Sequence, residues 1–113
     1  MSIYLYERLC FRESYGFAEK LYRIASEDEY IALQNSLEKH PDLGNLIRGL
    51  RGARKVRMAI GGRGKSGGAR VIYFLRVKKE IWFLDIYAKG DRKDFNNEER
   101  KTIFRFISEL KKG

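Results

Sequence analysis

The sequence predicts an α+β fold with helices first, a sheet second and one closing helix. Ser26-x-x-Glu29 and Asn96-x-x-Glu99 both match a capping box, in which two side chains accept hydrogen bonds from free backbone amides at a helix start. Between these helices, three runs of strand-forming residues with short connections predict an antiparallel meander. A chain of 113 residues with 43% hydrophobic content can close one core, so residues 1–113 are expected to form a single domain.

The first half is expected to hold one strand and two helices. Aromatic and aliphatic residues with interspersed charges favour a strand over residues 3–11, and apolar residues recur at i, i+4 and i+7 in a helix over residues 15–24. The helix that follows Ser26 should end at or before His40, because the residue before a proline is disfavoured in helical conformation. A loop punctuated by glycines then leads to the second half.

The second half is expected to hold three strands, over residues 53–60, 69–77 and 81–87. In the first of these, Lys55 and Arg57 lie on one face and three apolar side chains lie on the other, since side chains alternate along a strand. The helix after Asn96 has apolar residues at helical spacing, which predict a face buried against the sheet.

Charge is distributed unevenly along the chain. Residues 1–50 carry 6 Lys or Arg and 8 carboxylates, whereas residues 51–113 carry 18 Lys or Arg and 7 carboxylates. Residues 43–79 contain eleven Lys or Arg and no carboxylate. A patch of one sign attracts anions, so nucleic acid is the first candidate partner and an acidic protein segment the second.

Several classes of protein are disfavoured. The longest uncharged apolar stretch is far too short for a membrane helix, and Glu7 and Arg8 interrupt the region where a signal peptide would be apolar. No membrane association and a cytoplasmic location are therefore expected. A single cysteine, Cys10, excludes an internal disulfide and a Cys-based zinc site, and its apolar neighbours suggest a partly buried thiol.

The decamer GGRGKSGGAR, residues 61–70, imitates two phosphate-binding motifs. Both motifs place phosphate at the N-terminus of a helix that follows a strand, but here the loop leads into the strand-like run ARVIYFL. We therefore interpret the decamer as a basic hairpin loop and expect no nucleotide cofactor. Its basic character continues onto the preceding strand, which argues against a merely solvated loop.

From Ser26 onward the chain resembles a known family. The strings SEDEYIALQNSLEKHPDLGNLIRG, LRGARKVRMAIGGRGKSGGARVIYFL and IWFLDIYAKGDRKDFNNEERKTI are similar to RelE superfamily toxins of bacterial toxin-antitoxin systems, specifically the HigB-like subgroup. The resemblance implies a RelE-like fold whose sheet cradles mRNA on a translating ribosome, where the toxin acts as an endoribonuclease that inhibits translation. It also implies a cognate antitoxin, usually a helix-turn-helix protein through which operator DNA is bound.

RNA cleavage of this kind needs a base for the attacking 2′-hydroxyl, cations for the pentacoordinate phosphate and an acid for the leaving oxygen. The chain has neither a His pair nor a carboxylate cluster, so Lys and Arg would perform this chemistry without a metal or other cofactor. The resemblance implies that Arg70 contacts the phosphate, that Lys55 and Arg57 supply a base or a stabilising charge, and that Lys89 acts as an acid or a phosphate contact.

Further residues are expected to contact RNA or the ribosome. Arg63 and Lys65 lie in the glycine-rich loop, and Arg54 lies on the basic strand. Where RelE has a tyrosine near its last helix, this chain has RKDFNNEE, so Phe95 could stack on a base, and Tyr87 is an alternative aromatic on a strand. Asp85 could orient a Lys or Arg, and His40 is interpreted as structural.

Three other functions stay open. A ParE-like inhibitor of DNA gyrase would share the architecture but act on a protein target. A non-catalytic nucleic-acid-binding module would need only the sheet aromatics and the basic loop. A docking surface for an acidic partner would use the same basic face.

Overall fold

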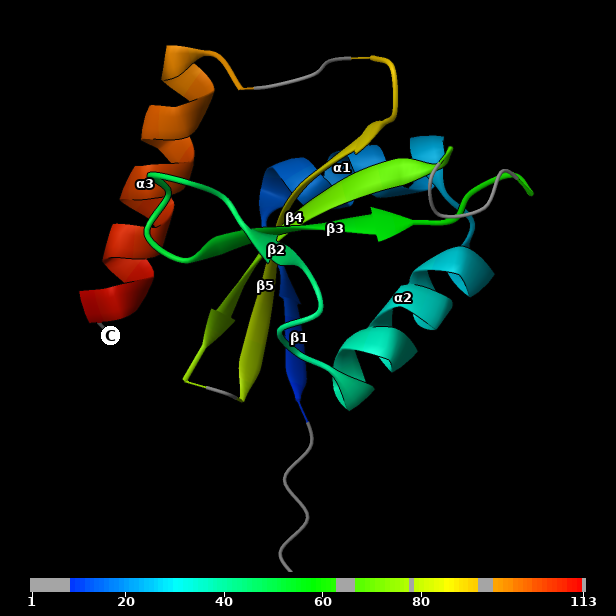
Figure 1. The fold of residues 1–113 in the computed structure, drawn as a ribbon, viewed down its shortest axis with the longest axis horizontal. Helices are drawn as coiled ribbons and strands as arrows, with labels where there is room; N and C mark the ends of the chain where they lie inside the picture. The colour runs from blue at the N-terminus through cyan, green and yellow to red at the C-terminus, as the bar shows by residue number, and fades with distance from the viewer. Residues whose placement is uncertain (1–8, 63–66, 78, 92–94, 113) are drawn as a thin grey trace, which may run out of the picture.

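The computed structural model describes residues 9–62, 67–77, 79–91 and 95–112. Within these residues, three helices and five strands follow one another in the order shown in Figure 1. Their bounds are β1 Cys10–Glu13, α1 Tyr15–Ile24, α2 Glu27–Lys39, β2 Asn45–Leu46, β3 Ala53–Met58, β4 Ala69–Arg76, β5 Glu80–Ala88 and α3 Asn97–Lys112. The predicted α+β fold is confirmed.

The sheet has the strand order β1-β5-β4-β3-β2. The predicted meander is confirmed, since β3, β4 and β5 pair antiparallel. The sheet as a whole is mixed, however, because β1 pairs parallel with β5. A strand was predicted over residues 3–11, and the observed strand β1 runs from Cys10 to Glu13, two residues beyond the predicted end. Residues 3–8 lie outside the described part of the chain.

Both predicted N-terminal helices are confirmed. Ser14 caps α1, and Ser26 and Glu29 form the predicted capping box of α2. The α2 helix ends at Lys39, directly before His40 and Pro41, as the proline rule requires. These helices cover one face of the sheet, where Phe17, Leu21, Leu37 and Phe83 are fully buried.

The opposite face of the sheet carries α3 (Figure 1). The predicted capping box is present, because Asn96 and Glu99 each accept a hydrogen bond from the other's backbone amide, at 2.8 and 3.0 Å. Ile103 and Ile107 of α3 pack against Ala53 and Phe74 of the sheet. The helix therefore covers the beginning of β3 and the end of β4, and leaves the other end of this strand pair to the site described below.

Tyr73 fixes the segment between α2 and β2. Its side chain is fully buried, its hydroxyl donates to Pro41 O at 2.8 Å, and the same hydroxyl accepts from Gly44 N at 2.9 Å. A Cβ on Gly44 would lie 2.8 Å from the Tyr73 ring and 3.0 Å from Lys55 O, so only glycine fits this approach. The segment that the sequence suggested as a loop thus contains the short strand β2, paired with β3.

The prediction that Cys10 is partly buried was wrong, because Cys10 is exposed on the edge strand β1. Apolar neighbours in the sequence did not predict its environment, since Leu9 and Phe11 pack on the core while the residue between them turns outward.

Candidate RNA-binding and catalytic face

Two arginines lie directly opposite each other on adjacent strands. Arg57 of β3 is the register partner of Arg70 of β4, and Arg70 is in turn the partner of Tyr87 of β5. Directly opposite residues have Cβ atoms about 4.5–5.5 Å apart, and like charges in such positions repel. A chain selected for stability alone would avoid this arrangement, so it indicates a site for an anion.

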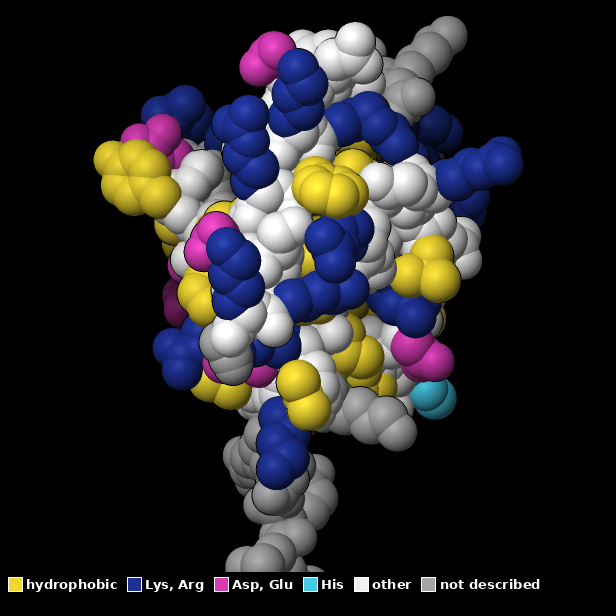
Figure 2. All heavy atoms as spheres, turned by 90° about the vertical axis from the view of Figure 1, so that its left-hand side faces the viewer, with side chains coloured by type: hydrophobic (Ala, Val, Ile, Leu, Met, Phe, Trp, Pro, Cys, Tyr) yellow, Lys and Arg dark blue, Asp and Glu magenta, His cyan; other side chains and the backbone are white. Residues whose placement is uncertain are grey.

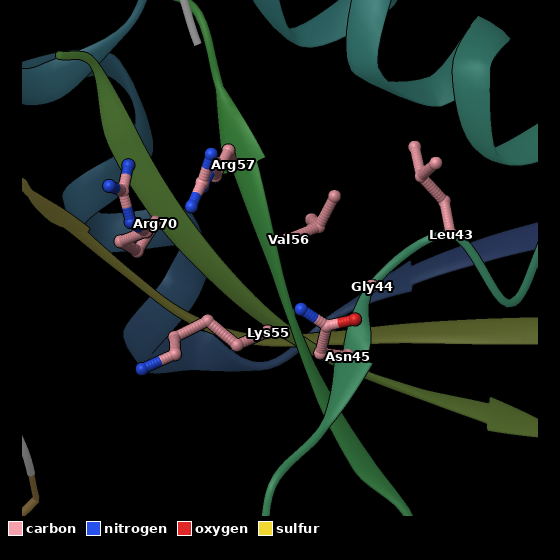
Figure 3. A pocket seen from close by; sticks show the side chains of 7 residues that line it. All are labelled: Leu43, Gly44, Asn45, Lys55, Val56, Arg57 and Arg70. Carbon is pink, nitrogen blue, oxygen red and sulfur yellow. The ribbon is translucent and has the colours of Figure 1, made fainter. Parts of the chain in front are cut away.

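Lys55 adds a third cation two residues before Arg57, on the same face of β3. Figure 3 shows the two guanidinium groups side by side and the Lys55 ammonium on the same side of the strand. The predicted split of β3 is thereby confirmed, since Val56 and Met58 are buried on the helix side while Lys55 is half-buried and Arg57 is exposed.

A hollow of about 530 Å³ opens beside these three cations. Its described lining contains no carboxylate and consists of Leu43, Gly44, Asn45, Lys55, Val56, Arg57 and Arg70 (Figure 3). Leu43 is 42% exposed, so the hollow offers an apolar wall as well as three positive charges. This combination fits a phosphate with its attached ribose or base.

Arg54 lies apart from this group, on the opposite face of β3. Its Nη1 donates to Gly44 O at 2.8 Å and to Asp42 O at 3.3 Å. The guanidinium thus braces the segment that carries β2, which argues against the expected contact with RNA.

A family model for the RelE toxin of the RelE/RelB toxin-antitoxin system matches residues 35–112. The match covers more than two thirds of the chain and includes the last turn of α2, the strands β2 to β5, and α3. The chain belongs to the RelE toxin family. It is therefore the toxin component of a toxin-antitoxin system, and RelE toxins act with an antitoxin partner.

Lys89 of this RelE-family toxin lies beyond the end of β5. By alternation it shares the face of Tyr87, two residues earlier, and its backbone amide donates to Gly68 O at 2.9 Å. Lys89 is exposed, and it lies two residues beyond Tyr87, the register partner of Arg70. Arg63 and Lys65, expected to bind RNA, lie outside the described residues.

The two aromatic residues expected to contact RNA lie in the core under α3. Tyr87 and Phe95 are 7% and 9% exposed, and their rings meet edge to face with centroids 6.3 Å apart. This burial argues against stacking on a base, because neither ring presents a free face to solvent. Tyr87 instead lies beside Arg70 on the same face of the sheet, since the two are register partners.

Asp85 accepts a hydrogen bond from Lys20 Nζ of α1 at 2.9 Å. A carboxylate that orients a cation was expected here, but the lysine concerned belongs to the helix side and was not predicted.

Two residues of the site were not predicted from the sequence. Leu43 precedes β2 and Asn45 is its first residue. Both line the hollow. A strand of two residues leaves no periodic pattern in the sequence, so nothing local indicated that this segment would lie beside Lys55.

Lys and Arg side chains extend over the side of the toxin shown in Figure 2.

Within the described ranges, no three His, Cys, Asp or Glu side chains gather as a metal site would require. No helix in the same part of the chain is long and apolar enough to cross a membrane.

Proposed function

We propose that this toxin cleaves mRNA on the translating ribosome, with the phosphate bound at Arg57, Arg70 and Lys55. The observation that supports this most strongly is the opposed arginine pair beside a hollow whose described lining holds no carboxylate. The family match supports a toxin that acts with an antitoxin, and the arginine pair supports a phosphate as the ligand.

The reaction follows from the side chains present. The 2′-oxygen loses its proton and bonds to the adjacent phosphorus, and the bond from phosphorus to the 5′-oxygen breaks as that oxygen gains a proton. Two guanidinium groups at the phosphate stabilise the extra negative charge of the pentacoordinate state. Both remain protonated near neutral pH, so neither is a good base.

Proton transfer therefore falls to the amines. Lys55 lies next to the arginine pair and is the proposed base for the 2′-hydroxyl, while Lys89 is the proposed acid or phosphate contact at the far side of Arg70. Asn45 is proposed to orient the nucleotide, since its amide faces the hollow (Figure 3).

Primer extension on a reporter mRNA tests the proposal. On expression of the toxin, cuts should occur within the translated frame and should disappear when translation is blocked. Intact messages together with inhibited DNA gyrase would contradict the proposal and favour the ParE-like alternative. Tight RNA binding without any cut would favour a non-catalytic binding module.

A further inference from the structure

A second cavity, of about 250 Å³, lies between α2 and β3. Side chains of α2 line it together with Arg57, Met58 and Ala59 at the end of β3. Leu43 and Arg57 also line the basic hollow described above, so the two cavities adjoin. Figure 3 shows the Leu43 side chain pointing from the hollow toward α2. We call this second cavity the α2–β3 groove.

Most of the side chains that line the α2–β3 groove are apolar. Leu33 and Met58 line it and are buried, and Ala32, Leu43 and Ala59 line it and are exposed. An apolar cavity with an open side favours a flat, uncharged group over a hydrated ion, because the ion would lose its water without a compensating charge. A nucleobase is such a group, and a phosphate is not.

The carboxylates at the groove also favour a base over a phosphate. Asp28 is exposed, and its side chain has no hydrogen bond or ion pair with any residue in the described part of the chain. The Glu29 carboxylate is already occupied, since Ser26 N and Gly61 N donate to it at 2.8 and 2.6 Å. A carboxylate repels an anion but accepts a hydrogen bond from an amino group such as that of adenine.

The edge of β3 supplies further polar groups. β2 pairs only with Arg54 and Lys55, so from Val56 to Met58 the outer edge of β3 has no strand partner in the described ranges. An unpaired strand edge presents backbone amides and carbonyls. Because residues 57–59 line the α2–β3 groove, this edge borders it and offers both donors and acceptors to a base.

We propose that the α2–β3 groove is a nucleobase subsite, which holds a base of the bound RNA while a phosphate of the same RNA lies at Arg57 and Arg70. The proposal rests on the proposed function for its ligand, RNA, and extends it by giving the base a site of its own. The two sites have opposite character: the hollow offers cations without a described carboxylate, and the groove offers apolar surface with acceptors.

Adenosine 5′-monophosphate and ribose 5-phosphate separate the two sites, because only the first carries a base. NMR titration of the isotopically labelled toxin measures both affinities. We expect adenosine 5′-monophosphate to bind the wild type about tenfold more tightly than ribose 5-phosphate, as for burial of a small apolar surface. Intermolecular nuclear Overhauser effects should join the adenine protons to the methyl groups of Ala32 and Leu33.

Ala32→Phe places a ring in the groove from an exposed helical position that does not line the hollow. We expect this variant to bind adenosine 5′-monophosphate only as tightly as ribose 5-phosphate, whose own affinity should match that of the wild type. Ala18→Phe is the matched control, because Ala18 is an exposed alanine within α1 and does not line the groove. It should change neither affinity.

Equal affinities of the wild type for the two ligands would overturn the proposal. Adenine contacts confined to residues outside the groove would overturn it as well, whatever the variants show. If ribose 5-phosphate leaves the signals of Arg57 and Arg70 unchanged, the phosphate site of the proposed function is contradicted instead, and the adenine contacts still decide the role of the groove.

Discussion

Arg57 and Arg70 repel each other across two adjacent strands, and this repulsion makes the site measurable through stability as well as activity. Arg70 is half-buried and donates through Nη1 to Ala69 O at 3.2 Å, so its guanidinium is held near the sheet rather than free in solvent. A phosphate between the two groups would relieve the repulsion. We therefore expect that the free toxin loses stability at the residues that we propose bind RNA.

Arg57→Gln tests whether the Arg57–Arg70 pair lowers the stability of the free toxin while it supports RNA cleavage. Removing one of two opposed like charges should raise the free energy of unfolding by about 0.2–1 kcal/mol, whereas RNA cleavage should fall. Urea unfolding and single-turnover cleavage are the two measurements.

Arg54→Gln is the matched control on the same strand. Since Arg54 braces the carbonyls of Asp42 and Gly44 on the other face, its replacement should lower the free energy of unfolding by about 1 kcal/mol and leave cleavage intact. A change of stability in the same direction in both variants would show that repulsion between Arg57 and Arg70 does not destabilise the free toxin.

At the scale of the elements, the site depends on how β2 is brought to β3. The segment before β2 is held from the buried core by Tyr73, whose hydroxyl accepts from Gly44 N next to Asn45, and also by the half-buried Arg54. A defect in the Tyr73 anchor should therefore reach the hollow, whereas the loss of Arg54 leaves that anchor in place.

Tyr73→Phe removes one of these anchors. The change leaves Pro41 O and the buried Gly44 N without the hydroxyl, and we expect the free energy of unfolding to fall by about 1–3 kcal/mol. Tyr22→Phe provides a control, since Tyr22 is 62% exposed and its loss of a hydroxyl should cost less than about 0.5 kcal/mol. Equal effects in urea unfolding would show that the Tyr73 hydroxyl does not hold the segment.

The turn end of the β4–β5 hairpin should be sensitive to acid. Glu80 accepts from Arg12 Nε at 2.9 Å, from Trp82 Nε1 at 2.6 Å and from Arg76 Nη1 at 3.3 Å. Arg12 is the main cause that holds the pKa of Glu80 below its ordinary 4.5, followed by Trp82 and Arg76. The stability that this carboxylate contributes is fully present above its unfolded pKa and is lost as pH falls through the lower folded pKa.

Glu80→Gln should therefore destabilise the toxin at pH 7 and make less difference in acid. Thermal midpoints of the wild type and the variant, measured from neutral pH down to about pH 3, should converge as the pH falls. A constant gap between the two midpoints would show that the charge of Glu80 is not what stabilises the hairpin.

Most elements could be predicted from the sequence because their signals are local. Both capping boxes, the proline after α2 and the alternation along β3 depend on residues within a few positions of each other. The pairing of β1 with β5 could not be predicted in this way, since it joins residues about 70 positions apart. Cys10 was misjudged for the same reason, because its exposure depends on that edge position.

The candidate site shows the same division. Alternation alone put Lys55 and Arg57 on one face, but the register that sets Arg57 against Arg70 depends on the length and turn of the intervening loop. Aromatic character could not reveal that Tyr87 and Phe95 would be buried under α3, because burial of a strand aromatic depends on which helix packs over it.

At the scale of the whole molecule, the two faces of the sheet have separate tasks. The helix side holds one core with α1 and α2, and the other side divides its area between α3 and the basic hollow. Since 11 basic residues occur without a carboxylate between residues 43 and 79, the sequence segment that builds β2, β3 and β4 also supplies the positive field. Anions are thus drawn to the part of the sheet that α3 leaves open.

The central claim is that Arg70 stabilises the transition state of RNA cleavage and contributes little to folding. Single-turnover cleavage of a ribosome-bound message at saturating ribosome concentration tests it most directly, with wild type, Arg70→Ala and Arg54→Gln compared in parallel. We predict that Arg70→Ala lowers the saturated rate by about 100-fold or more, with an unchanged thermal midpoint and with Arg54→Gln near the wild-type rate. A wild-type rate in Arg70→Ala, or an equal loss in Arg54→Gln, would contradict the assignment of this face as the catalytic site.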